Sequence, residues 1–567
     1  MSLWRFKSIV FIFSLFFVLV VIRLFYWQVL QTDKLQTLAT SQYFLQEEIP
    51  ASRGQILTSD GFPLISNTAA YLLYAIIPEI DQSPQNIMTK IANSLKKERK
   101  IGSEEEASLK SRLESENLIW VPLLRKLKLS EKAAVESLGI KGLGFEEEST
   151  RDYPEGSMAA HLVGFVGKDV SGQDTGYFGL EGFYNRELTG KPGIIRTEKD
   201  AMGKPIIIGK RTKEEQIPGR DLELYLDRDI QFMVENRLKE GLDTYKAKSG
   251  SVVVMDPATG GIIAMASFPS YAPANFNDFN KSYFPNPVVA DGFEPGSIFK
   301  VLVMAGAINE KAVSPDERCP KCSEARVIGE DVIKTWNDKY HPDESMSDIL
   351  LYSDNVGMVY VGEKLGKEKL LKTIRNFGMG ELTGIDLEEE SSPRLKADNQ
   401  WYPIDLATIS FGQGIAVTPI QMVTAVSAIA NRGNLLTPQV VHKIISPEKT
   451  IEIKPKIKRR VISPTTAKVV TEMMVNAVEK GEAAGFKVPG YRIAGKTGTA
   501  QIPIAGHYDD KKTIASFVGF APADKPKFVM LVSLQEPTSS QWGSRTAAPL
   551  WFEIARDIFL RWKIPPQ

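Results

Sequence analysis

An apolar run opens the chain. Residues 9–22 are apolar apart from Ser14, and after Arg23 the apolar pattern continues over residues 24–30, which include a tyrosine and a tryptophan. The two parts together cover about 20 residues, which is enough to cross a bilayer as a helix. Arg23 lies late in the run, where its long side chain reaches an interface that also suits the aromatic pair. The pattern therefore predicts a transmembrane helix.

The residues that flank this run predict its orientation. Arg5 and Lys7 precede it without a nearby acidic residue. Positive residues favour the cytoplasmic side, so the N-terminus is expected in the cytoplasm and the residues after about 30 outside the cell membrane. The segment 31–36 has no small-x-small cleavage site, which argues against a signal peptide. We expect a single-pass plasma-membrane protein with an extracytoplasmic body.

The body begins with a segment of short strands and polar helices, residues 42–226. Within it, residues 84–118 are rich in charge, and Ile87, Ile91 and Leu95 recur at helical spacing. This pattern is typical of helices that bury one face and expose the other to solvent. We expect a small domain of mixed α and β structure.

The pattern changes after residue 248. Two apolar runs, 250–256 and 262–266, flank a Pro/Gly turn and predict a β-hairpin. Further runs at 513–522 and 527–534 predict two more strands, and residues 547–562 predict a final helix. Strands at both ends with helices between them indicate an antiparallel sheet flanked by helices.

A chain of 567 residues is too long for one ordinary core. The predicted fold class is a multidomain α/β (α+β) protein. The expected boundaries are a cytoplasmic tip and anchor over residues 1–30, a mixed domain over 31–226, a linker over 227–247 and a second domain over 248–567.

Charge and cysteine content narrow the function. Basic and acidic residues balance at 69 each, so the chain lacks the basic excess that nucleic-acid binding needs, and no nucleic-acid partner is expected. Cys319 and Cys322 are the two cysteines. A zinc site would need two more ligands from four scattered histidines, so the pattern favours a short disulfide staple on a surface loop. No metal and no cofactor are predicted.

The first chemical motif is Ser297-Ile-Phe-Lys300. It follows Pro295-Gly296 and opens a nearly wholly apolar segment that ends at Ile308. This predicts a buried helix with Ser297 at its positive end and Lys300 on the same face. A serine hydroxyl needs a base to act as a nucleophile. Lys300 can serve if it is neutral, and burial together with a nearby Lys496 would favour that form.

Two further motifs follow in order: Ser353-Asp-Asn355 and Lys496-Thr497-Gly498-Thr499. Ser353 and Asn355 can flank the nucleophile, and the Lys-Thr-Gly-Thr segment suits a strand edge that holds a substrate carboxylate. Each motif is weak alone, since Ser-x-x-Lys recurs at 94–97 and 446–449. The ordered set is a specific signature of a serine acyl-transfer site.

At this point the sequence resembles the class B penicillin-binding proteins over nearly its whole length. Their N-terminal (pedestal or dimerisation) domain has signatures similar to residues 53–56, 151–154, 159–167 and 179–182, and residues 411–414 resemble part of their transpeptidase domain. The resemblance assigns residues 31–226 to the pedestal and 248–567 to the penicillin-binding transpeptidase domain. Residues 355–357 and segment 159–167 also favour the septal, cell-division type over the elongation type.

The resemblance implies an acyl mechanism on peptidoglycan stem peptides, with a D-Ala-D-Ala donor and an amine acceptor. Ser297 would attack, Lys300 would be the base, and Ser353 with Asn355 would relay protons and bind the peptide. Lys496 and Thr497 would hold the terminal carboxylate, Gly498 would let the substrate backbone approach closely, and Thr499 would supply a backbone donor. β-Lactams would acylate the serine. A lipid-linked glycan polymerase and division proteins are the implied partners.

Two other functions use the same residues. A D,D-carboxypeptidase or β-lactamase would resolve the acyl-enzyme with water, and a β-lactam sensor or division scaffold would keep the fold without turnover. The membrane anchor and the pedestal segment favour the transpeptidase over the hydrolase, and the intact motifs favour it over the scaffold.

Overall fold

The structure is a computed structural model, and it describes residues 3–36, 44–49, 51–96, 101–114, 120–170, 172–198, 211–504 and 507–566. Within the segment predicted as charged helices, residues 97–100 and 115–118 lie outside the described residues. The chain divides into two compact units. The first comprises residues 1–53 and 189–219, and the second comprises residues 54–188 and 220–567.

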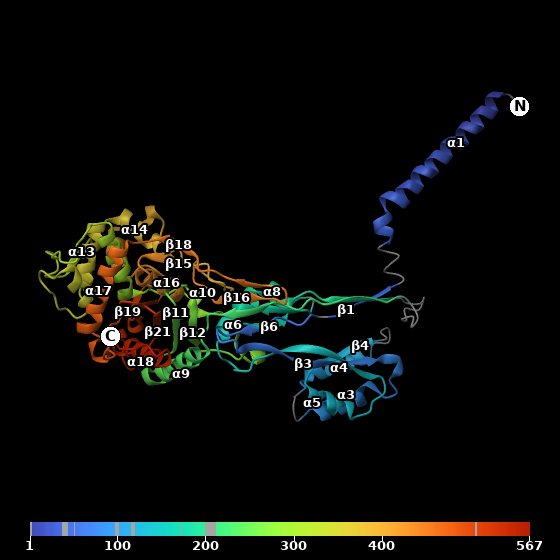
Figure 1. Cartoon of the computed structure of the whole chain (residues 1–567), viewed down its shortest axis with the longest axis horizontal. Helices are drawn as coiled ribbons and strands as arrows, with labels where there is room; N and C mark the ends of the chain where they lie inside the picture. Colours follow the sequence, from blue (N-terminus) through green and yellow to red (C-terminus); the bar gives the residue numbers. More distant parts are fainter. Residues whose placement is uncertain are drawn as a thin grey trace. The chain divides into compact units, whose positions relative to one another are not determined.

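The first unit holds the predicted membrane helix. Helix α1 (Leu3–Phe25) continues into the short π-helix η1 (Tyr26–Leu30), and the span is long and apolar enough to cross a membrane (Figure 1). No residue of α1 is buried. The same unit contains an antiparallel sheet of three strands in the order β1-β8-β9: β1 (Phe44–Ile49), β8 (Gly193–Glu198) and β9 (Arg211–Glu214).

The second unit begins with a mixed sheet in the order β17-β16-β10-β2-β3-β4, and a further strand, β5, pairs with β3. The long strand β3 pairs with three others, β2, β4 and β5. One face of this part of the sheet is covered by helices whose buried residues include the predicted Ile87, Ile91 and Leu95. The elements are β2 (Ile56–Leu57), β3 (Pro63–Ile76), β4 (Trp120–Leu127), β5 (Leu143–Asp152), β10 (Asp221–Leu224), β16 (Val441–Ile445), β17 (Thr450–Glu452), α3 (Pro84–Leu95), α4 (Ser103–Leu113) and α5 (Leu129–Glu136).

Strands β16 and β17 show a pairing that the sequence pattern did not predict. They lie more than 200 residues after β10 in the chain, yet β16 pairs with β10 in antiparallel fashion. The buried carboxylate of Asp386 fixes the start of β16, since it accepts from the amides of Val440 and Val441 at 2.6 and 2.9 Å. It also accepts from the Tyr184 hydroxyl at 2.9 Å.

Two of the quoted sequence signatures meet in space. The Arg151 guanidinium contacts the Glu181 carboxylate at 2.7 Å, and both side chains are buried. Arg151 comes from the end of β5, and Glu181 comes from α7 (Gly179–Phe183). The short elements around this pair are α6 (Ala160–Val163), β6 (Phe165–Lys168), β7 (Asp174–Tyr177) and α8 (Asn185–Thr189).

The predicted antiparallel sheet is present in the C-terminal part, with five strands in the order β12-β11-β21-β20-β19. The hairpin of β11 (Ser249–Met255) and β12 (Ile262–Phe268) is confirmed, as are β20 (His507–Ala521), β21 (Phe528–Gln535) and the final helix α18 (Ala547–Arg561). Strand β19 (Ala494–Ile504) lies at the edge of this sheet.

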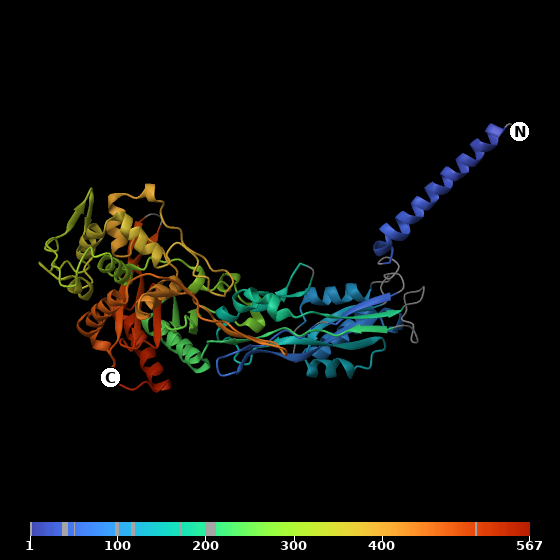
Figure 2. The same ribbon diagram turned by 45° about the horizontal axis from the view of Figure 1, so that its top comes forward.

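Helices cover both faces of this sheet, which explains why its strands read as continuous apolar runs. Val252 and Val254 face a core shared with α9 and α18, while Val253 and Met255 face the larger core on the other side. Figures 1 and 2 show α9 and α18 along one face of the sheet. The helices of the larger core include α11 (Lys300–Asn309), α13 (Asn355–Leu365), α16 (Pro419–Ala430) and α17 (Pro464–Lys480).

The remaining elements of the C-terminal part are short or lie at the surface. They are α10 (Pro287–Ala290), α12 (Met346–Leu351), α14 (Lys367–Asn376), α15 (Pro403–Ser410), β13 (Arg326–Ile328), β14 (Asp331–Ile333), β15 (Asn434–Leu436) and β18 (Ile457–Arg460), with 3-10 turns η3 (Pro273–Asp278), η4 (Lys281–Tyr283), η5 (Gly296–Phe299), η6 (Asp398–Gln400), η7 (Ala484–Phe486) and η8 (Gly543–Arg545). A further 3-10 turn, η2 (Ile77–Glu79), follows β3 in the N-terminal part of this unit.

The stretch 227–247, predicted as a linker, forms helix α9 (Arg228–Tyr245). Asp227 caps its N-terminus through the amides of residues 229 and 230. Ile230, Val234 and Leu238 are spaced four residues apart and are buried against the five-stranded sheet. The apolar face of this helix gives the segment a packing role. The domain boundaries themselves stay predictions.

The two cysteines form the predicted disulfide, but the predicted surface location is wrong. Cys319 and Cys322 are bonded to each other and neither is exposed to solvent. Both belong to the larger core cluster, and the Cys319 amide donates to the Glu344 carbonyl at 2.9 Å. A disulfide is apolar, so it packs into a core in a way that two charged zinc-binding thiolates would not.

Candidate active site

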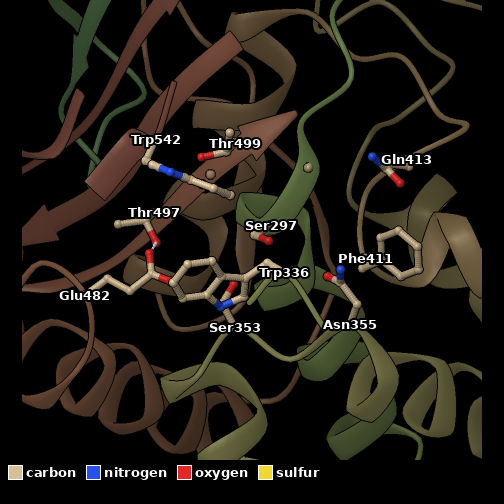
Figure 3. A pocket seen from close by; sticks show the side chains of 12 residues that line it. Ser297, Trp336, Ser353, Asn355, Phe411, Gln413, Glu482, Thr497, Thr499 and Trp542 are labelled. Carbon is tan, nitrogen blue, oxygen red and sulfur yellow. Dashed lines mark hydrogen bonds between the residues drawn. The ribbon is translucent and has the colours of Figure 1, made fainter. Parts of the chain in front are cut away.

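The three motifs line one narrow cleft in the C-terminal part. Its twelve lining residues include Ser297 and Gly296, Ser353 and Asn355, and three residues of the strand edge, Thr497, Gly498 and Thr499, together with Trp336, Phe411, Gln413, Glu482 and Trp542. Figure 3 shows the side chains of Ser297, Ser353, Asn355 and Thr497 around this cleft. The structure therefore brings together every site residue that the sequence predicted, with the ammonium groups of Lys300 and Lys496 buried beneath them.

Ser297 lies at the start of the predicted apolar helix. It belongs to the 3-10 turn η5, which runs directly into α11 at Lys300. Gly296 before it has a φ of +55°, and a Cβ there would come within 2.9 Å of the Thr499 carbonyl oxygen. Only glycine adopts this backbone at so close an approach without strain. Its absence of a side chain lets the turn carrying Ser297 lie against β19.

Ser353 lies in the turn between two capped helices. Ser345 caps α12, and the Asp354 carboxylate caps α13 by accepting from the Gly357 amide at 2.9 Å. Asp354, the middle residue of the second motif, thus has a structural role. Ser353 itself has a φ of +56°, a left-handed conformation that costs a non-glycine residue about 1–3 kcal/mol. Asn355 is the first residue of α13.

The Lys300 ammonium connects the first motif with the second. Its Nζ lies 2.6 Å from the Ser353 carbonyl oxygen, 2.8 Å from Asn355 Oδ1 and 3.4 Å from Ser353 Oγ. No hydrogen bond joins Lys300 to Ser297 among the residues that the structure describes. The amine is thus held by the turn that carries the second motif, one helical turn from the Ser297 hydroxyl.

Lys496 connects the third motif with the second. Its Nζ donates to Ser353 Oγ at 2.9 Å and lies 3.3 Å from the carbonyl and hydroxyl oxygens of Thr497. Further along the strand, the Thr499 hydroxyl accepts from the Gly543 amide at 2.9 Å. Ser353 Oγ therefore lies between the two buried amines.

Burial and mutual repulsion change the charge of these amines. Burial, reinforced by the positive charge of Lys496, lowers the pKa of Lys300 to about 7. Asp354, Glu482 and Glu344 oppose this shift. Burial also lowers the pKa of Lys496 to about 8. A large fraction of Lys300 is therefore neutral near pH 7, which is the form that can accept a proton.

Comparison with known proteins agrees with this geometry. The family model of the penicillin-binding protein transpeptidase domain matches residues 250–560, and that of the penicillin-binding protein dimerisation domain matches residues 48–224. The chain belongs to the penicillin-binding proteins. Stage V sporulation protein D of Bacillus subtilis is 34% identical over 97% of this chain and 84% of its own length.

Two further relatives cover this penicillin-binding protein almost completely. The peptidoglycan D,D-transpeptidase FtsI homolog of Mesostigma viride is 29% identical over the whole chain and 97% of its own length. The crystal structure of penicillin-binding protein 3 of Mycobacterium tuberculosis in complex with aztreonam is 26% identical, covers 92% of this chain and 98% of its own, and has a TM-score of 0.70.

Sequence reasoning missed five of the lining residues. Phe411 and Gln413 were quoted only as part of the family resemblance. Trp336 and Trp542 come from distant loops and pack edge to face with centroids 5.2 Å apart beside the cleft. Lone tryptophans carry no motif signal, and neither does Glu482 in its Gly-Glu-Ala turn.

Proposed function

We propose that this protein is a membrane-anchored serine D,D-transpeptidase that cross-links peptidoglycan stem peptides. One observation carries the proposal. A partly exposed serine, two buried amines, a second serine and a carboxamide, drawn from three separate motifs, line or underlie a single cleft. Family membership and the aztreonam complex of a structural relative support it.

The contacts of Lys300 suggest how the first step works. A neutral amine has two hydrogens and one lone pair. The two short contacts, to the Ser353 carbonyl and Asn355 Oδ1, use the two hydrogens. The lone pair is then left for a hydroxyl proton. Ser297 Oγ attacks the carbonyl carbon of the penultimate D-Ala while its proton passes to Lys300 Nζ.

The strand edge supports the same step. Strand β19 is an edge strand, so its outer backbone groups are available to an extended peptide. The amides of Ser297 and Thr499 are the proposed oxyanion hole, and each such donor is worth about 10²–10³-fold in rate. Lys496 and Thr497, next to Gly498, hold the terminal carboxylate of the donor peptide.

The tetrahedral intermediate then collapses. The bond between the carbonyl carbon and the last D-Ala nitrogen breaks, and that nitrogen takes a proton through the Ser353 hydroxyl, which lies between the two amines. An ester on Ser297 remains. The amine of a second stem peptide attacks this ester, the proton it loses returns to Ser297 Oγ, and a new peptide bond forms as the cross-link.

The cellular setting is part of the same proposal. Arg5 and Lys7, at the start of α1 and ahead of its apolar run, favour a cytoplasmic N-terminus. In that orientation the cleft would lie outside the cytoplasm, where peptidoglycan lies. Contacts with a lipid-linked glycan polymerase and with division proteins, and the septal subtype, follow from the family resemblance.

Labelling with a fluorescent penicillin tests the function. The full-length protein in detergent is expected to form a long-lived adduct that peptide mapping places on Ser297, and Ser297→Ala is expected to form none while keeping its melting temperature. Loss of the adduct within seconds would favour the hydrolase, and a folded wild-type protein without any adduct would favour the non-catalytic scaffold.

A further inference from the structure

A carboxylate at the rim of the cleft is not part of the three motifs. Glu482 lies in the turn between α17 and η7, and its side chain is exposed. The Thr497 hydroxyl donates to Glu482 Oε2 at 3.3 Å. Figure 3 shows this side chain reaching the Thr497 hydroxyl from the side of the cleft. Of the twelve described residues that line the cleft, Glu482 alone is acidic.

The charge of Glu482 acts on both catalytic amines. Burial lowers the pKa of Lys496, and Glu482 opposes that shift. Burial and Lys496 lower the pKa of Lys300, and Glu482 again opposes the shift. Glu482 therefore supplies, from the protein itself, part of the negative charge that a bound carboxylate would supply from the substrate.

Glu482 and the substrate compete for one proton. A threonine hydroxyl can donate only one hydrogen bond. In this structure Thr497 gives that bond to Glu482. A donor peptide held by Lys496 and Thr497 would need the same bond for its terminal carboxylate, and two carboxylates so close to each other repel.

We propose that Glu482 is a specificity-determining residue that competes with the substrate for the Thr497 hydroxyl and sets the preference of the cleft between anionic and uncharged C-terminal groups. This inference rests on the proposed function. An anionic ligand has to displace the Glu482 side chain into water, which its exposed position permits. An uncharged ester or carboxamide meets no such repulsion.

The test compares acylation by benzylpenicillin with acylation by its methyl ester, which lacks the negative charge. The measured quantity is the ratio of the two second-order rate constants in the full-length protein in detergent. Glu482→Gln is expected to raise this ratio, anion over ester, by roughly three- to tenfold. Glu482→Asp keeps the charge and is expected to stay close to the wild-type ratio.

Glu479→Gln is the matched control. Glu479 is exposed on the last turn of α17 and does not line the cleft, yet its replacement makes the same change in net charge. The pH profile gives a second readout that structural damage would not produce. Loss of the Glu482 charge is expected to move the acid limb of acylation to lower pH for both ligands, because that charge raises the pKa of Lys300.

The outcomes separate this inference from the proposed function. Equal ratios in Glu482→Gln and Glu479→Gln, in proteins that are acylated on Ser297, would overturn the role of Glu482 alone. An unchanged ratio with a longer-lived adduct would place the carboxylate in deacylation and would also overturn it. A wild-type protein without an adduct on Ser297 would overturn the proposed function, and this inference with it.

Discussion

Two of the places where the described part of the chain buries positive charge differ in the groups that surround that charge. In the N-terminal part of the second unit, the buried Arg151 guanidinium contacts the buried Glu181 carboxylate at 2.7 Å. In the cleft, Lys300 and Lys496 are both buried and their close contacts are neutral oxygens of Ser353, Asn355 and Thr497. A buried cation with a direct counter-charge holds structure together. Two buried amines without a direct counter-charge have lowered pKa values, so they can lose a proton near neutral pH, as acid–base chemistry requires.

The largest expected effect on acylation comes from a substitution at Lys300 that keeps the positive charge but cannot lose its proton. Arginine stays protonated in proteins, so Lys300→Arg retains a cation but has no lone pair to act as a base. The acylation rate constant is expected to fall by about 10²–10⁴-fold. Stopped-flow or quench measurements with a fluorescent penicillin check this. Acylation within threefold of wild type would remove Lys300 from the role of base.

Replacing Arg151, the cation that is paired with Glu181, should lower the stability of the protein and leave its acylation rate unchanged. Arg151→Met removes the guanidinium that faces the buried Glu181 carboxylate, which is expected to cost about 3–5 kcal/mol in the free energy of unfolding. Denaturant titration measures it. The double variant Arg151→Met with Glu181→Leu removes both charges and is expected to recover most of that loss. In the folded fraction, active-site titration should give a wild-type acylation rate.

A smaller effect tests the coupling between the two amines. The positive charge of Lys496 lowers the pKa of Lys300 after burial has done so. Lys496→Gln is therefore expected to raise the pKa of Lys300 and move the acid limb of the acylation profile to higher pH. The measurement compares the midpoint pH of the acid limb in the variant and in the wild type, so a lower absolute rate does not affect it. A limb that stays in place would show that the amines titrate independently.

Sequence patterns predicted the parts of this protein that depend on neighbouring residues. The membrane helix, the β11–β12 hairpin and the apolar helix behind Ser297 follow from local periodicity, and the structure has all three. Helix α9 differs, because the segment was predicted as a linker although its Asp227 cap and four-residue apolar spacing were present in the sequence.

Other features depend on contacts between distant residues. Strand β16 joins a sheet that begins nearly 400 residues earlier, through its pairing with β10 and the contact of Asp386 with the amides at its start. The two cysteines are covered by core side chains from separate elements. Glu482 reaches Thr497 across a turn that has no motif of its own. These contacts join residues that are far apart in the sequence, and no local periodicity or spacing predicts them.

The pH dependence of wild-type acylation tests most directly whether Lys300 is a neutral base. Burial and the charge of Lys496 place its pKa at about 7, so the neutral fraction grows as the pH rises through that value. The acylation rate constant with a fluorescent penicillin is therefore expected to rise from pH 5.5 and to level off above about pH 8, with a midpoint near pH 7. A midpoint close to the ordinary lysine pKa of about 10.4 would contradict this.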